Sequence, residues 1–242
     1  KAGQWLFTNH KISAKAHAHL MDDYTGFAQT LGIAVDEPEW HMPISEIDEQ
    51  RAQKILFPNA QQPVAVISLA GNNGTPHWHV KGYVQTADYL EQLGFCVVLC
   101  SDSSMVATQL AESICQQSQA SVLNLVGKTS IKQLLVIFKL AHITFSSSRD
   151  SIHMSTTVGT PVVGLYAFNN PRKVAPYSSQ KYIVSCYEQV IEEQKGKPYA
   201  ELAWGVQAKG KNLMDRLTVE EVKSKINLVL EDFYSVEFNL KS

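Results

Sequence analysis

Three polar stretches of this sequence combine residue types that bind anions. Residues 71–76 (GNNGTP) hold glycines and asparagines, which permit tight turns with exposed backbone amides. Residues 127–130 (GKTS) and 146–153 (SSSRDSIH) add small hydroxyl side chains and cations. Amides at a helix start attract phosphate, because they offer free donors at the positive end of the helix dipole. A loop between buried strands is polar in any case, so a phosphate site and an ordinary surface loop are both open interpretations.

The segments that position these stretches alternate between two patterns. Short apolar runs, typical of strands buried on both faces, lie at 62–70, 95–100, 122–126, 143–145 and 161–166. Apolar residues at helical spacing predict helices at 80–93, 105–116 and 131–141, and a short one that ends at Gly159. Such alternation predicts an α/β fold, a Rossmann-like parallel sheet with helices on both faces. Ligands of such sheets gather at the carboxyl ends of the strands, where the polar stretches fall.

The two ends of the chain extend this pattern. Before the first buried strand we predict a strand at 4–9, a helix at 19–31, a proline-containing linker at 37–43 and a helix at 45–56. After the last polar stretch we predict a strand at 182–186 and a helix at 187–195. Thr218, with Glu221 three residues later, predicts a capping box at the start of a final helix.

Composition excludes several classes of protein. The 242 residues carry a net charge of -2, which gives no support for a nucleic-acid partner. The longest apolar runs are far too short to span a bilayer, and no secretory signal is evident. The four cysteines lack the paired spacing of metal ligands, so we expect no metal site and a reducing, cytoplasmic location.

Residues 121–177 resemble the C-terminal half of the ADP-heptose:lipopolysaccharide heptosyltransferases, glycosyltransferase family 9. The likeness rests on two runs, NLVGKTS and HMSTTVGTPVVGLYAFNNP, and continues on both sides. The resemblance implies the C-terminal half of a GT-B glycosyltransferase. It divides the chain into a remnant of the N-terminal domain with a linker (1–44), a nucleotide-sugar-binding Rossmann-like domain (45–217), and a helix that packs back toward the N-terminal domain (218–242). A complete N-terminal half needs about 100 residues, so we expect most of it to be missing.

The resemblance also implies which residues hold the donor. In the family, the first loop cradles the phosphates, the GKT/S turn presents backbone groups to the base, and a D-S-G-P-x-H motif binds and orients the donor. The matching residues here are Gly71, Asn72, Asn73, Lys128, Thr129, Ser148, Arg149, Asp150, Ser151 and His153. His153 contacts either a phosphate or the acceptor, or it is bonded to the backbone at a helix start; both interpretations stay open.

Three positions depart from the family pattern. Pro76 stands where a cation is expected, Ser148 replaces the aspartate and Asp150 replaces the glycine. In one interpretation Arg149 supplies the missing cation to a phosphate and Asp150 positions a hydroxyl. In the other, Arg149 and Asp150 are a solvated pair on a loop that no longer binds the donor, because an aspartate repels phosphate at short range.

The resemblance implies an inverting transferase that moves heptose from ADP-heptose to the lipopolysaccharide inner core, without a cofactor. Its acceptor would be met at the inner face of the inner membrane, with peripheral membrane contact. Inversion requires a general base for the acceptor hydroxyl. The family's base lies in the N-terminal domain, so no residue of this chain is assigned that role. The alternative is a non-catalytic binding or scaffold relative with an eroded donor site.

Overall fold

The computed structural model describes residues 6–9, 12, 16–36, 38–56, 62–70 and 77–235. Its centre is a six-stranded sheet in the order β3-β2-β1-β4-β5-β6, and every neighbouring pair is parallel. The strands are β1 (Val64–Ser68), β2 (Cys96–Cys100), β3 (Leu123–Asn124), β4 (Ile143–Ser146), β5 (Val162–Tyr166) and β6 (Val184–Ser185). The predicted parallel sheet is confirmed. The predicted turn at 71–76 lies outside the described residues.

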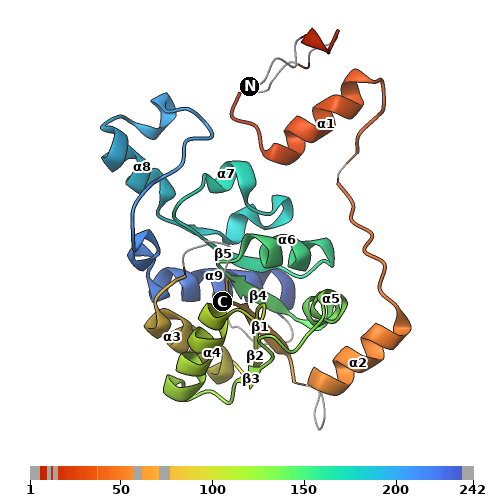
Figure 1. Ribbon diagram of the computed structural model, residues 1–242, viewed down its shortest axis with the longest axis vertical. Coiled ribbons are helices and arrows are strands. Elements are labelled where there is room, and N and C mark those ends of the chain that lie inside the picture. Colours follow the sequence, from red (N-terminus) through yellow and green to blue (C-terminus); the bar gives the residue numbers. More distant parts are fainter. Residues whose placement is uncertain are drawn as a thin grey trace.

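Helices connect the strands and cover the sheet (Figure 1). They are α1 (Leu20–Thr30), α2 (Glu46–Leu56), α3 (Val80–Gln92), α4 (Met105–Gln117), α5 (Ile131–Leu140), α6 (Arg149–Thr157), α7 (Pro171–Val174), α8 (Tyr187–Lys195) and α9 (Val219–Tyr234). Short 3-10 turns lie at Tyr177–Tyr182, Tyr199–Glu201 and Leu213–Arg216. The predicted capping box of the last helix is present, since Thr218 Oγ1 accepts from the Glu221 amide and Glu221 returns a carboxylate to the Thr218 amide.

Successive residues of the central strands point to opposite faces, and both faces are buried. Ala65 and Ile67 of β1 belong to a large core with α3, α4, α8 and α9. Val64 and Val66 belong to a second core with α2 and α5. In Figure 1, α3 and α4 lie on one side of the strands and α5 on the other. Helices therefore cover both faces, as predicted, and the loops at the strand ends remain available for other contacts.

The first 45 residues are arranged differently. The strand predicted at 4–9 is wrong over its described part: Leu6–Asn9 form a turn, and Leu6 and Phe7 are 64% and 89% exposed, so burial that would favour a strand is absent there. α1 lies beyond α7, and an irregular segment then runs past α6 and α5 to α2 (Figure 1). Along the described parts of the chain, no helix has the length and apolarity that crossing a membrane requires.

Candidate functional site

The strand order reverses between β1 and β4. The chain proceeds from β1 through β2 to β3 on one side, and from β4 through β5 to β6 on the other. β1 and β4 are paired in register up to their last residues, Ser68 and Ser146, so the two following loops leave the sheet side by side. In doubly wound sheets, ligands bind in the crevice that such a reversal opens at the carboxyl ends of the strands.

Small hydroxyl side chains join these two strand ends. Ser68 Oγ donates to Ser151 Oγ at 2.7 Å, and both residues are buried. Ser146 Oγ donates to the Ser68 carbonyl at 2.8 Å and accepts from the Ser148 amide at 2.9 Å. The β4 loop is therefore fixed against the end of β1 by hydrogen bonds rather than by bulky side chains, which leaves room for a ligand to approach the backbone.

The start of α6 lies at this junction, and its backbone amides have no side-chain cap. Ser148 is the N-cap residue, but its side chain makes no capping hydrogen bond to the first turn. The first-turn amides are thus not occupied by a cap and are available to an anion. Arg149 and Asp150, which begin the helix, are both exposed. No ion pair between these two side chains is present in the described structure.

A cluster of buried aromatic side chains packs next to the junction. The rings of Trp78, Tyr83 and Phe145 lie in mutual edge contact, with centroids 5.7 to 5.9 Å apart, and all three are buried. The Tyr83 hydroxyl is 2.9 Å from Ser147 Oγ, while Trp78 Nε1 donates to the Leu217 carbonyl. Burial raises the pKa of Tyr83, so its hydroxyl stays protonated and keeps this hydrogen bond. The cluster thus connects α3 to the start of the β4 loop at Ser147.

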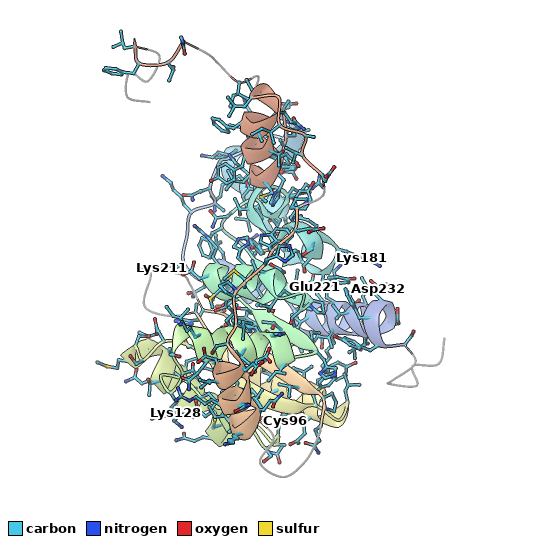
Figure 2. All side chains as sticks on the ribbon, turned by 90° about the vertical axis from the view of Figure 1, so that its right-hand side faces the viewer. Cys96, Lys128, Lys181, Lys211, Glu221 and Asp232 are labelled. Atoms are coloured by element: carbon cyan, nitrogen blue, oxygen red, sulfur yellow. The ribbon has the colours of Figure 1, made fainter. Side chains whose placement is uncertain are left out.

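The predicted residues Lys128 and Thr129 lie at the same edge of the sheet, in the turn that follows its outer strand, β3. β2 and β1 separate this turn from β4. Lys128 Nζ donates to the Asn124 carbonyl at 2.8 Å, and Figure 2 shows Lys128 near one end of the molecule. Gly127 has a φ of +69°, and a Cβ there would meet Ser103 Cβ at 3.0 Å. The β3 turn thus packs on the β2 loop, and not on residues 148–153.

His153 lies on the α7 side of α6. It is half-buried, and burial, followed by repulsion from His19, lowers its pKa. A hydrogen bond to the backbone of Val174 acts in the opposite direction. Both interpretations of this histidine, a contact with phosphate or acceptor and a backbone bond at the helix start, stay predictions.

A cavity of about 520 Å³ that the sequence did not indicate opens beside the start of α6. Its walls are the β4 loop, α6, the end of β5 and the segment 207–210. Tyr166 and Lys209 line it together with Arg149. The only sequence signal for Lys209 is its place in a polar run, QAKGKN at 207–212, which is also ordinary for a surface loop.

The described part of the chain contains no group of side chains that could hold a metal ion. No three histidine, cysteine or acidic side chains gather there in a way that would hold a metal ion. All four cysteines are free thiols, and Cys100 and Cys186 are buried. Burial raises the pKa of the Cys100 thiol to about 12, so it behaves as a small apolar side chain.

An open parallel sheet with this strand order, and with polar loops at its reversal point, is characteristic of doubly wound nucleotide-binding domains. Sequence comparison identifies one family within that class. The model of glycosyltransferase family 9 (heptosyltransferase) matches residues 1–203, and the chain belongs to this family. The resemblance predicted from residues 121–177 is thereby confirmed.

Individual relatives agree with this assignment. The chain is 34% identical over 222 residues to the lipopolysaccharide core heptosyltransferase OpsX of Haemophilus influenzae, covering 92% of this chain and 63% of that protein. A family 9 glycosyltransferase from Veillonella parvula superposes with a TM-score of 0.72 at 18% identity, covering 92% and 63%. E. coli heptosyltransferase WaaC with ADP superposes with a TM-score of 0.61 at 18% identity, covering 93% and 61%. The two structures establish the shared fold, and the chain spans less than two thirds of each relative.

Proposed function

We propose that the protein to which this chain belongs transfers heptose from ADP-heptose to the lipopolysaccharide inner core, with inversion at the transferred carbon. Family membership and the likeness to a lipopolysaccharide core heptosyltransferase support this reaction class. The part described here would hold the nucleotide half of the donor. The general base would come from the N-terminal domain, as the family resemblance implies, and the acceptor would be met at the membrane surface.

The observation that carries the proposal is the junction of β1 and β4. Its hydrogen-bonded serines are small, and the first turn of α6 keeps its amides free of a side-chain cap. A diphosphate placed there accepts from these amides and gains from the helix dipole. By the family resemblance, residues 71–76 would cradle the phosphates, and in the sequence they follow Ser68, the end of β1, after two intervening residues.

The base of the nucleotide would extend from this junction toward β2 and β3. The loops after these strands touch at Gly127 and Ser103, and α4 and α5 begin there with exposed apolar side chains. Met105 is 74% exposed and Ile131 is 77% exposed. Apolar side chains exposed beside polar loops offer a surface against which a purine ring can pack. Lys128 and Thr129 would border this surface.

The departures from the family pattern bear on affinity. Asp150 brings a carboxylate to the first turn of α6, where a donor phosphate would lie, and like charges there oppose binding. Arg149 offsets part of that repulsion, because it follows directly on the β4 loop and is engaged in no ion pair with another described residue. We expect a functional but weakened diphosphate site.

Calorimetry on the chain with ADP, ADP-heptose and UDP tests the proposal. ADP and ADP-heptose should bind with sub-millimolar dissociation constants, and UDP more weakly. Asp150→Asn removes the opposing charge and should tighten ADP binding several-fold, whereas Asp23→Asn, in the first turn of α1, should leave it unchanged. If ADP and ADP-heptose fail to bind at millimolar concentration, the proposal is wrong and a non-catalytic relative with an eroded site is the better account.

A further inference from the structure

The cavity beside α6 is separate from the β2 and β3 side of the sheet, where the nucleotide would lie. It opens between the start of α6, the end of β5 and residues 207–210. Its volume of about 520 Å³ is in the range that accommodates a small saccharide. Its walls are fixed by long-range hydrogen bonds: the Ala208 amide donates to the Phe168 carbonyl, and Gln207 Nε2 donates to Asn169 Oδ1, both at 2.9 Å.

The charge of the cavity is positive. Its lining includes two cations, Arg149 and Lys209, and no carboxylate. Neither cation forms an ion pair with any residue that the structure describes. Asp150 is the nearest acidic residue in sequence, and it is exposed and not among the lining residues. Two unpaired cations around one cavity attract an anion more strongly than either does alone, because their fields add.

A buried hydroxyl also lacks a partner there. Tyr166 lines the cavity and is only 7% exposed, yet no described residue hydrogen-bonds its Oη. Burial raises its pKa, with Arg149 acting in the opposite direction, so the phenol stays protonated and remains a donor. A buried hydroxyl without a hydrogen-bond partner is unfavourable, and an acceptor oxygen on a ligand would satisfy it.

We propose that this cavity binds the anionic group, a phosphate or a carboxylate, of the acceptor saccharide. Arg149 and Lys209 would neutralise the group and the Tyr166 hydroxyl would donate to one of its oxygens. The polar side chains of Asn169 and Gln207 would face the sugar. The inference rests on the proposed transferase function, because it places the acceptor next to the start of α6, where the donor phosphates would lie.

Nuclear magnetic resonance titration of the chain tests this site separately from the donor site. The probes are glucose 6-phosphate, glucuronate and glucose, added with and without ADP. The anionic sugars should shift the amides of residues 166–169 and 207–210, and neutral glucose should not. Glucose 6-phosphate and glucuronate distinguish a phosphate from a carboxylate as the preferred group. ADP alone should instead shift residues 101–104 and 127–130, none of which lines the cavity.

Matched variants give the decisive comparison. Lys209→Gln and Tyr166→Phe should each weaken binding of the preferred anionic sugar about three- to tenfold. Lys211→Gln, an exposed lysine two residues further on and outside the cavity, should not change it (Figure 2). Equal shifts with glucose, or unchanged binding in both cavity variants, would overturn the inference. Loss of ADP shifts alone would instead count against the proposed function and leave the cavity result standing.

Discussion

The centre and the outer end of the sheet's carboxyl edge are built in different ways. At its centre, where β1 and β4 meet, Ser68, Ser146 and Ser147 are all at most 6% exposed and bonded to groups far away in sequence. At its outer end, the turn after β3 is exposed, and its lysine bonds to a carbonyl only four residues away. The side chains at the centre therefore bond across the fold, whereas at the outer end only the backbone of the turn is bonded to the β2 loop, from the Gly127 amide to the Ser101 carbonyl, and the lysine side chain bonds within its own turn.

This difference suggests that the centre would bind the diphosphate and the outer end would bind the base. A diphosphate needs donors held at fixed positions, since its charge is stabilised only by groups that are already oriented. The base of a nucleotide depends less on precisely oriented donors than on contact with apolar side chains. Exposed residues beside the turn after β3 would provide that contact. Mutations at the centre should therefore reduce both stability and ADP binding, and mutations at the outer end should affect binding alone.

The largest expected effect is at Trp78, under the centre. Trp78→Ala removes a ring that is 2% exposed and in contact with Tyr83 and Phe145, together with the hydrogen bond to Leu217. It should lower the free energy of unfolding by about 3–5 kcal/mol, because a large cavity opens in the core. Urea denaturation of the chain measures this. A loss below about 1 kcal/mol would show that the aromatic cluster does not support the centre.

The second largest loss of stability is expected at Ser146. Ser146→Ala leaves the Ser148 amide without its acceptor and the Ser68 carbonyl without that donor. An unsatisfied buried donor costs about 1–3 kcal/mol, so the free energy of unfolding should fall by that amount and ADP binding should weaken with it. Ser113→Ala is the matched control, because its hydroxyl bonds only to its own helix on an exposed face. Equal losses in the two variants would contradict the assignment.

His153 makes the stability of the chain sensitive to pH. Its pKa is lowered by burial and by repulsion from His19, so the unfolded chain binds its proton more readily than the folded chain does. Stability should therefore fall as the pH drops from 7 through 6.5 toward the lowered pKa. His153→Gln should reduce this slope without abolishing it, because burial also lowers the pKa of His77. Urea denaturation at several pH values measures the slope, and an unchanged slope in the variant would contradict the prediction.

Local patterns in the sequence were sufficient to predict most of the fold. The helix predicted at 80–93 and that at 187–195 match α3 and α8 within a residue, because apolar periodicity and capping residues act over a few positions. The strand predicted at 122–126 is shorter, because β3 pairs with β2 alone and lies at the edge of the sheet. The strand predicted at 182–186 is reduced to Val184–Ser185 for the same reason, since β6 is the other edge.

The candidate site was less accessible to sequence reasoning. Serines at 146–151 read as a polar loop, and their bonds to Ser68 join residues 78 and 83 positions apart, which no local pattern encodes. The cavity is lined by both Arg149 and Lys209, which lie 60 positions apart in the sequence. The roles of the ten predicted binding residues, and the division at 44 and 217, stay predictions. α9 buries Val222, Ile226 and Val229 in the main core, and its packing against an N-terminal half is likewise a prediction.

The smallest expected effect on stability is at Lys128, and it gives the clearest test of the comparison. Lys128→Met removes one exposed hydrogen bond to Asn124 and should change the free energy of unfolding by no more than about 0.5 kcal/mol. ADP binding should nevertheless weaken about two- to fivefold, because the lysine borders the proposed surface for the base. Lys132→Met, at the second residue of α5, is the control and should leave ADP binding unchanged. If Lys128→Met destabilises the chain as much as Ser146→Ala does, the lysine contributes more than a bond within its own turn, and the contrast between the centre and the outer end of this edge does not hold.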